Sequence, residues 1–316
     1  MSSSDTENIG LSYFDLHCDT LTELTARNEP LEYGSTHVSL KKTAVYRHYA
    51  QVFAIFCHPD LSPEEGRELF RKSVTVIASA MTEGKVTPYL SVENATILGT
   101  DVGYSEKLAR CGVRFITPVW SGDNPLGGAY NTDSGLTSFG KDAVKHMIEC
   151  GIIPDVSHSS LCTFDEIADA AALKGIPFVA THSNSRSVCD HPRNLYDGQF
   201  RTVMQSGGIV GISLCRMHLS ENDSCGIDDI VDHIEHYFGL GGEHSVCLGC
   251  DFDGVDTLPD GIQSAAYLPR LYQRMAQRGF SESQINDVFY NNAAIFFEKN
   301  SIKPLSDAET VATDIL

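Results

Sequence analysis

The sequence predicts an α/β fold of the (β/α)8 barrel class, built as a single domain over residues 1–316. Eight short apolar runs alternate with longer helix-like segments, as expected for buried parallel strands that are covered on both faces. A chain of 316 residues is also long enough for one large barrel. The alternative is an open doubly wound sheet, which usually carries a glycine-rich loop after its first strand. The segment LHCDT at residues 16–20 is not such a loop.

The predicted strands share a length of five to seven residues and a nearly continuous apolar content. They are residues 13–17, 50–56, 86–92, 113–119, 151–156, 176–181, 208–214 and 245–250. In a barrel all strands run the same way, so the residues that follow them gather at one mouth. The carboxyl ends of these runs are therefore where chemistry is expected.

The predicted helices begin and end at recognisable residues. The first opens with Ser62 and Pro63, which are typical of an N-cap and of the first helical position. The set comprises residues 63–83, 104–111, 138–150, 160–174, 198–206, 227–238, 264–278 and 282–299. Two long loops, residues 28–49 and 120–137, follow the first and fourth runs on the side where barrel enzymes build their active sites.

Composition excludes several classes of protein. The net charge of −19 argues against nucleic acid as a partner, because a basic face is missing. No apolar run is long enough to predict a membrane span, and neither end of the sequence resembles a signal peptide or a lipid-anchor tail. We therefore expect a cytoplasmic protein without a membrane anchor, in which residues 1–11 form a disordered segment.

Side chains that can bind metals follow five of the eight runs. They are His17 and Asp19, Glu93, His158, His182 and Asp251. Residues i and i+2 of a strand point to the same side, so His17 and Asp19 are expected to leave the first strand side by side. Imidazole and carboxylate groups are good ligands for zinc, and a carboxylate has two oxygens with which to bridge two cations. The pattern indicates a site for two metal ions.

The same stretches resemble a known family. The chain is similar to the membrane dipeptidase (renal dipeptidase) family of zinc peptidases, within the amidohydrolase superfamily. The matching segments are DLHCDT (15–20), YLSVEN (89–94), RFITPVWSGDNPLG (114–127), residues 135–160, THSNSRSVCDHPRN (181–194) and GCDFDG (249–254). Their order and spacing match from residue 14 to about residue 299. The resemblance implies a metallo-dependent hydrolase barrel, two Zn²⁺ per chain and a homodimer.

The resemblance also implies the roles of the metal-binding residues. His17 and Asp19 match the ligands of the first zinc, and Glu93 matches the carboxylate that bridges the two ions. His158 and His182 match the ligands of the second zinc. From the residues alone, Asp155 is a further hypothesis, as a partner that orients His158 or His182.

Three more residues are assigned through the resemblance. Asp251 matches the catalytic carboxylate that handles the proton, and Arg193 matches the arginine that binds the C-terminal carboxylate of the substrate. Trp120 stands where members of the renal type carry a histidine that contacts the oxyanion. An indole donates one N–H and cannot be protonated, so Trp120 is expected to alter which substrates bind rather than the class of reaction.

The predicted activity is zinc-dependent hydrolysis of the peptide bond of dipeptides by a metal-bridging hydroxide. Acceptance of D-residues at the C-terminal position is an additional hypothesis. The alternatives are another binuclear amidohydrolase, such as an N-acyl-amino-acid hydrolase or a lactonase, and a metal-binding protein without catalysis. The complete set of ligands together with Asp251 argues against the last of these.

Overall fold

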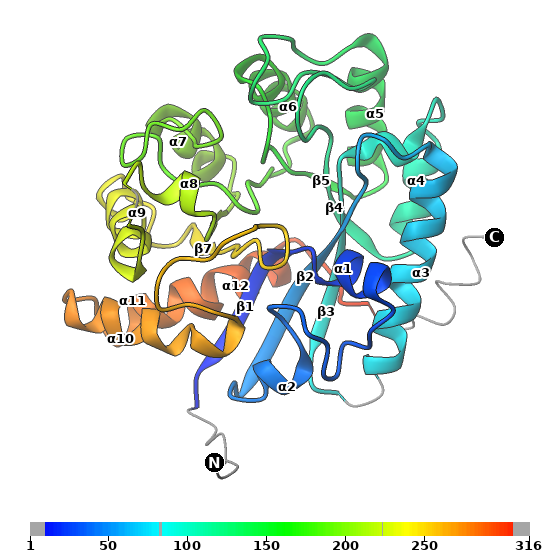
Figure 1. Ribbon diagram of the computed structural model, residues 1–316. Coiled ribbons are helices and arrows are strands. Elements are labelled where there is room, and N and C mark those ends of the chain that lie inside the picture. Colours follow the sequence, from blue (N-terminus) through cyan, green and yellow to red (C-terminus); the bar gives the residue numbers. More distant parts are fainter. Residues whose placement is uncertain (1–9, 82–83, 223, 306–316) are drawn as a thin grey trace.

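The computed structural model describes residues 10–81, 84–222 and 224–305. Of the N-terminal segment expected to be disordered, all but Gly10 and Leu11 lie outside these residues. Within them, parallel strands form one sheet in the order β5-β4-β3-β2-β1-β7-β6 (Figure 1). The strands are β1 Ser12–Cys18, β2 His48–Phe56, β3 Thr87–Glu93, β4 Val113–Thr117, β5 Ile153–Pro154, β6 Val210–Ile212 and β7 Val246–Leu248.

The parallel α/β architecture is confirmed, but the predicted eight-stranded barrel is confirmed only in part. The run 176–181 does not form a strand; Val179 and Ala180 make single parallel bridges to Asp155 and Val210. These bridges lie between β5 and β6, the two ends of the sheet order. Pro177 lacks a backbone N–H, which removes one donor that a regular ladder in this run would need.

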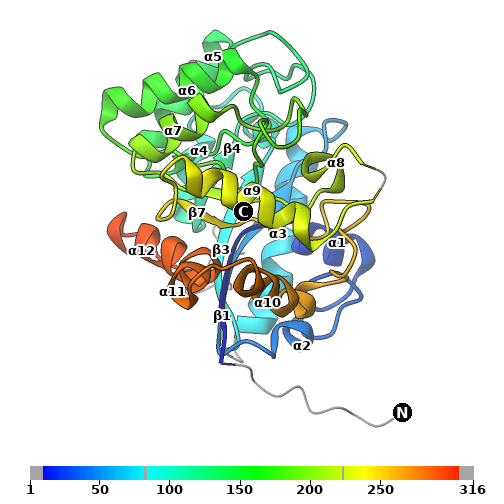
Figure 2. The same ribbon diagram turned by 90° about the vertical axis from the view of Figure 1, so that its left-hand side faces the viewer.

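The helices of the described residues surround the strands, as Figures 1 and 2 show from two sides. They are α1 Thr20–Arg27, α2 Leu40–Thr43, α3 Pro63–Met81, α4 Tyr104–Arg110, α5 Ser138–Glu149, α6 Leu161–Lys174, α7 Asp197–Gln205, α8 Arg216–Leu219, α9 Ile227–Gly239, α10 Pro269–Gln277, α11 Glu282–Asn286 and α12 Asn292–Lys299. Short 3₁₀ turns (η1 Ala95–Leu98, η2 Ala265–Tyr267) and a π-helical turn (η3 Asp287–Asn291) complete them.

The predicted helices are confirmed with small shifts at their ends, except that residues 82 and 83 of the predicted helix 63–83 lie outside the described residues. Three helices are additional. The sequence did not predict α1, α2 or α8, which lie within the segments that follow β1 and β6. The predicted helix 264–278 is divided into η2 and α10. The predicted helix 282–299 is divided into α11, η3 and α12.

Two apolar cores hold the fold together. The outer core lies where the helices pack on the sheet, with Phe53 and Ile55 of β2 among its members. The inner core takes residues from every predicted strand run, and these are Phe14, Leu16, Ala50, Val52, Tyr89, Phe115, Ile153, Val179, Ile209 and Cys247. Phe297 of α12 packs on Phe14 and Tyr89, with ring centroids 4.6 and 4.5 Å apart. Helix α12 covers the end of the inner core that is formed by Phe14 and Tyr89. The carboxyl ends of the strands are therefore free to form the site.

Candidate active site

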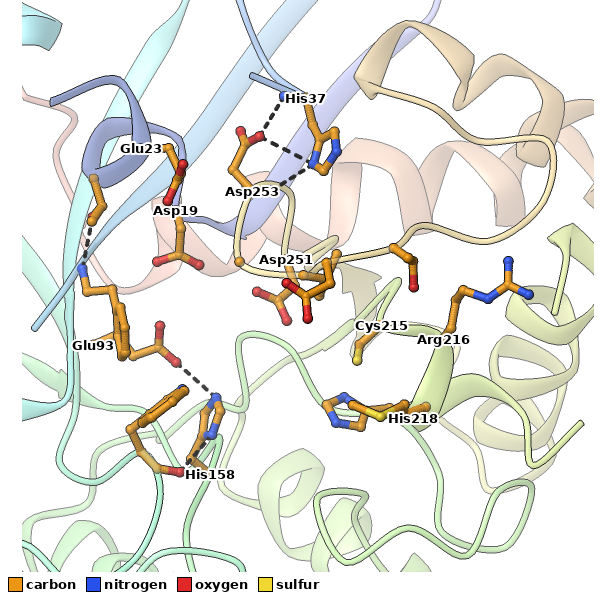
Figure 3. A pocket seen from close by; sticks show the side chains of 18 of the residues that line it. Asp19, Glu23, His37, Glu93, His158, Cys215, Arg216, His218, Asp251 and Asp253 are labelled. Carbon is orange, nitrogen blue, oxygen red and sulfur yellow. Dashed lines mark hydrogen bonds and ion pairs between the residues drawn. The ribbon is translucent and has the colours of Figure 1, made fainter. Parts of the chain in front are cut away.

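A cavity of about 780 Å³ lies at the carboxyl ends of the strands (Figure 3). Six of the eight predicted site residues line it, namely Asp19, Glu93, Trp120, His158, Arg193 and Asp251. The other two, His17 and His182, are each 1% exposed and lie against Glu93. The structure therefore brings all eight predicted residues together.

A β-bulge in β1 directs His17 toward Glu93. Asp15 pairs with Gln51 of β2 and Cys18 pairs with Phe53, so β1 contains one extra residue between these pairs. Phe14 and Leu16 belong to the inner core, so strict alternation would place His17 on the outer face. A bulge of this kind re-aims a side chain, and such bulges are common beside active sites.

Acidic groups surround the Nε2 atom of His17. It lies 3.4 Å from Asp19 Oδ2, 3.5 Å from Glu93 Oε2 and 3.9 Å from Asp251 Oδ1. Among the described residues, neither His17 Nε2 nor Asp19 Oδ1 has a hydrogen-bond partner, although both are buried. Buried polar atoms are nearly always paired, so these two atoms fit a site that takes a cation.

Two further histidines meet at the other oxygen of Glu93. The Nε2 atoms of His158 and His182 are 3.0 Å apart and lie 2.9 and 3.6 Å from Glu93 Oε1. His158 Nδ1 lies 2.9 Å from the carbonyl oxygen of Trp120. A carbonyl only accepts, so His158 carries its proton on Nδ1 and leaves Nε2 free to act as a ligand.

Glu93 stands between these two groups and faces each with one oxygen. Buried sets of potential ligand atoms form around it, one of His17, Glu93 and His182 and another of His17, Asp19 and Asp251. The atoms of each set lie within 4.8 Å of one another. Imidazole nitrogens and carboxylate oxygens at this spacing suit a divalent metal such as zinc, and a carboxylate facing both ways can bridge two ions.

The histidines differ in the charge that surrounds them. Burial lowers the pKa of His17, but the carboxylates of Glu93 and Asp19 outweigh it and raise the pKa well above its usual value. Burial, together with the nearby charge of Arg193, lowers the pKa of His158 to about 4. Burial likewise holds the pKa of His182 well below its usual value. Neutral imidazole is the form that binds a metal.

Burial and neighbouring carboxylates raise the pKa values of two acidic residues in the site. Burial raises the pKa of Asp251 to about 8, with His17 opposing this and Asp19 adding to it. Burial and the charge of Glu93 raise the pKa of Asp19 to about 6. Carboxylates pressed together in a buried site are costly unless cations share it. Divalent ions would remove this cost and return both acids to their ionised form.

The backbone is strained at this edge of the sheet. His158, Asp251 and Asn94 adopt left-handed conformations, with φ of 69°, 60° and 63°. Non-glycine residues rarely occupy this region, and such conformations cluster at functional sites. Gly254 adds a steric requirement, because a Cβ there would collide with the carboxylates of Asp19 and Asp251.

Arg193 places a buried positive charge beside these groups. Arg193 is 4% exposed, and its guanidinium donates to Ser183 Oγ at 3.0 Å and to the carbonyl of His182 at 2.9 Å. Its Nε–H is buried and has no partner among the described residues. No carboxylate of those residues lies within ion-pairing distance of it. A buried guanidinium that lacks an acidic partner is suited to bind an anionic ligand.

Trp120 forms an aromatic wall with Phe56, their ring centroids 4.8 Å apart. The ring of His58 lies 6.2 Å from that of Trp120, but its side chain is half exposed and outside the cavity lining. His218 also lines the cavity. Burial and Arg193 lower its pKa to about 2, so it is neutral.

Other lining residues were not predicted, and they come from segments that carry no metal-ligand pattern. Glu23 and Arg27 of α1, His37 of the loop between α1 and α2, and Met217 of α8 are examples. Asp253 accepts from the backbone N–H of His37 at 2.6 Å, and so joins this loop to the segment after β7.

Comparison with known proteins agrees with this geometry. A sequence model of the family described as membrane dipeptidase (peptidase family M19) matches residues 68–304. The chain belongs to this family. It is therefore a metallo-dipeptidase, a hydrolase that acts on peptide bonds. A Klebsiella pneumoniae protein described as an uncharacterized protein in the pqqA 5' region is 35% identical over 193 residues, which are 57% of this chain and 70% of that protein.

Solved structures share the fold. Dipeptidase AC, a metallopeptidase of family M19, is 25% identical with a TM-score of 0.81, over 92% of this chain and 99% of that one. A Rhodobacter sphaeroides metallopeptidase, solved with a phosphinate mimic of the dipeptide L-Ala-D-Ala, is 24% identical with a TM-score of 0.80, over 92% and 99% of the two chains. The probable dipeptidase PvdM of Pseudomonas aeruginosa is 18% identical with a TM-score of 0.80, over 93% and 96%.

Among the described residues, no helix combines the length and the apolar character that a membrane span requires.

Proposed function

We propose that this metallo-dipeptidase holds two Zn²⁺ and hydrolyses free dipeptides. The observation that carries the proposal is the pairing of two features in one cavity. One is Glu93, which faces potential ligands with both oxygens, and the other is Arg193, a buried cation without an acidic partner. The first suits two cations, and the second suits the free carboxylate of a short peptide.

The proposed ligands follow the two sides of Glu93. His17 and Asp19 would hold the first zinc, and His158 and His182 the second, with Glu93 shared between them. Zinc ions bound there would lower the pKa of a water molecule and polarise the scissile carbonyl. His17 Nε2 and Asp19 Oδ1, which have no hydrogen-bond partner among the described residues, are consistent with this arrangement.

Asp251 is proposed to move the proton. Its carboxylate lies in the cavity, 3.9 Å from His17 Nε2, and its left-handed backbone and the neighbouring Gly254 fix its direction. An ionised Asp251 can accept a proton from the attacking water and donate it to the leaving amine. Burial raises its pKa toward neutrality, and a pKa near the working pH suits a group that must first accept the proton and then give it up.

The charges in the cavity lining are proposed to orient the substrate. Arg193 would bind the terminal carboxylate with N–H groups that include the unpaired Nε–H. Glu23, which is ion-paired with Arg27 at 2.8 Å, and Asp256 also lie in the lining, and their negative charge suits a free α-amino group. A zwitterion as short as a dipeptide fits both requirements, and a protein chain does not.

Two finer features of substrate choice are part of the proposal. The L-Ala-D-Ala mimic bound by the Rhodobacter sphaeroides enzyme supports acceptance of D-residues at the C-terminal position. The aromatic wall of Trp120 and Phe56 is proposed to contact the substrate and to narrow the range of side chains.

We further propose a single domain whose barrel is closed by the segment 176–181. The inner core, to which Val179 contributes beside residues of every strand run, supports this closure. We also propose a cytoplasmic homodimer, and the net charge of −19 is consistent with the lack of a nucleic-acid partner.

Metal analysis together with a substrate panel tests the proposed function. The zinc-loaded protein should hydrolyse dipeptides, including those with a C-terminal D-residue, and should contain two zinc ions per chain. N-acyl amino acids keep the carboxylate but lack the free amine, and lactones lack both. Preferential turnover of either class, or less than one zinc per chain, would contradict the proposal.

Arg193→Ala sharpens the test. Loss of a buried charge-assisted contact should lower kcat/KM for dipeptides by about 100-fold or more, mainly through KM, and should leave a neutral lactone unaffected. Arg110→Ala is the matched control, since that arginine lies on the surface of α4 with its side chain 66% exposed. An equal effect of both substitutions would exclude a specific role for Arg193.

A further inference from the structure

The hydroxyl of one threonine lies between two of the proposed metal ligands. Thr181 is 1% exposed, and its Oγ1 is 2.9 Å from His182 Nδ1 and 3.5 Å from His17 Nδ1. These two histidines face different oxygens of Glu93, His17 facing Oε2 and His182 facing Oε1. The same hydroxyl also donates to Oδ2 of the buried Asp155. One oxygen atom thus joins the outer nitrogens of two histidines to a carboxylate.

The single hydrogen of the Thr181 hydroxyl fixes the donor and the acceptor in each of these three hydrogen bonds. A threonine hydroxyl has one hydrogen and two lone pairs, whereas an ionised carboxylate can only accept. The hydrogen of Thr181 is therefore directed to Asp155, and its lone pairs remain for the two imidazoles. Each imidazole must then carry its proton on Nδ1, which leaves Nε2 with a free lone pair that points at Glu93.

The carboxylate that receives this hydroxyl is held in place. Asp155 Oδ1 accepts from the backbone N–H groups of Ser157 and Thr181, at 2.9 and 3.0 Å. Asp155 Oδ2 also accepts from Thr117 Oγ1 at 2.9 Å. Among the described residues, the hydrogen bonds to both oxygens of Asp155 all come from donors, so the carboxylate is oriented to accept from Thr181. Asp155 was expected to contact His158 or His182, but it reaches His182 only through Thr181.

We propose that Thr181 is a positioning residue that fixes the tautomers of His17 and His182 together. The inference rests on the proposed two-zinc site and adds to it a physical link between the two ions on the side away from Glu93. His158 is outside this link, because the carbonyl of Trp120 sets its tautomer. The hydroxyl of Ser157, 3.5 Å from Thr181 Oγ1, is a more distant neighbour and contacts neither histidine ring.

The tautomers can be observed in the unchanged protein. Long-range ¹H–¹⁵N correlation spectra of the zinc-loaded chain should show the proton on Nδ1 and the metal on Nε2 for both His17 and His182. A proton on Nε2 of either residue would overturn the proposal. This measurement requires no variant and so does not depend on whether any variant folds.

Three substitutions then separate positioning from general packing. Thr181→Val keeps the shape and removes the hydroxyl, and it should weaken zinc binding at both sites by roughly 10–100-fold, measured by competition with a chromophoric chelator. Thr181→Ser restores the hydroxyl and should recover affinity to within a few-fold of the original. Thr117→Val is the matched control, because it removes a donor from Asp155 without contacting either histidine.

The outcomes are distinguishable from failure of the proposed function. If the unchanged protein neither binds two zinc ions nor hydrolyses dipeptides, the two-zinc function itself is wrong. If it does both, and Thr181→Val keeps full affinity or Thr117→Val weakens binding as much, the positioning role is wrong. Loss of affinity at one site only would also contradict it, since the hydroxyl contacts one ligand from each.

Discussion

The two halves of the sheet hold their parts of the site in different ways. In β1, β2 and β3, which have seven to nine residues each, long ladders carry His17 and Glu93 to the site, and the ladder of β1 is interrupted only by the bulge at His17. In β5, β6 and β7, which have two or three residues each, the ladders are short. There, His158 and His182 lie beyond the regular structure and are held by hydrogen bonds to Trp120 and Thr181. Backbone register positions one group of ligands, and side-chain contacts position the other.

The halves also differ in charge. The carboxylates around His17 raise its pKa, whereas burial and Arg193 depress the pKa of His158 and of His182. The side of β1 and β3 is therefore acidic, and the side of β5 and the segment 176–181 favours neutral histidine. Glu93 belongs to the first half and contacts the histidines of the second. Substituting Glu93 therefore affects both halves at once.

Glu93→Gln should have the largest effect, because it removes the negative charge that both groups of histidines face. We expect kcat/KM to fall by more than about 1,000-fold, beyond the loss of a single oxyanion donor, and the bound zinc to decrease. Ser91→Ala is the control. Ser91 precedes Glu93 by two residues on the same face of β3, and its buried hydroxyl has no partner among the described residues. Comparable activity of the two variants would refute the bridging role.

Lowering the pH should destabilise the second half of the fold, because His233 of α9 becomes protonated. Its Nδ1 accepts from the N–H of Ser185 and its Nε2 donates to the carbonyl of Leu219, both at 3.0 Å, which requires the neutral ring. Burial, partly offset by the Leu219 contact, lowers its pKa to about 4. Since the folded pKa lies below the unfolded value near 6.5, this stabilisation is complete above pH 6.5 and is lost as the pH falls toward 4.

Protonation of His233 should lower the free energy of unfolding by roughly 3 kcal/mol. Urea titrations of the metal-free protein at pH 7, 5 and 4 should show the loss, and His233→Gln should remove that part of the pH dependence. If the original and variant chains lose stability in parallel between pH 7 and 4, His233 is not the source.

Gly254→Ala should disturb the first half without unfolding it. The new methyl would meet the carboxylates of Asp19 and Asp251, so these must move from their positions. We expect kcat/KM to fall by about 10–100-fold, as for other changes that displace metal-site groups, with little change in Tm. Gly198→Ala in α7 provides the control, since nothing lies within 4 Å of its added methyl. Full activity of Gly254→Ala would show that the carboxylates tolerate displacement.

Trp120→Phe should have the smallest effect. The substitution keeps the backbone carbonyl that holds His158 and keeps an aromatic ring beside Phe56. Loss of one neutral N–H donor would change kcat/KM by about 10-fold at most. Steady-state kinetics on several dipeptides would measure this. A loss of more than 100-fold for every substrate would instead assign the indole N–H to the oxyanion.

The two halves also differ in how well the sequence predicts them. His17, Asp19 and Glu93 could be identified because each lies at or just after the end of an apolar strand run, and β1 to β4 were predicted nearly to their ends. The run 176–181 was predicted as a strand because it is apolar, and apolar content does not report that β6 and β7 approach it closely. A Cβ on Gly211 or Gly249 would meet the carbonyl of Thr181, so the chains are pressed together there.

Contacts between distant residues were beyond prediction for a physical reason. The bulge in β1 depends on pairing with β2, and the link from Thr181 to His17 joins residues 164 positions apart. Helices α1 and α8 were missed because α1 is rich in threonine, a weak helix former, and α8 has only four residues. Their contribution to the cavity lining therefore had no signal in spacing or periodicity.

The position of β1 in the sheet has a consequence for synthesis of the chain. Asp15 pairs across to Leu248 of β7, so one edge of this early strand stays open until the last strand has been made. At about 5–20 residues per second, that interval is roughly 10–50 s. An exposed, apolar strand edge invites pairing with other nascent chains, and an inward charge discourages it. Asp15 supplies such a charge, and in the finished protein it accepts the backbone N–H of Cys250 that closes the edge.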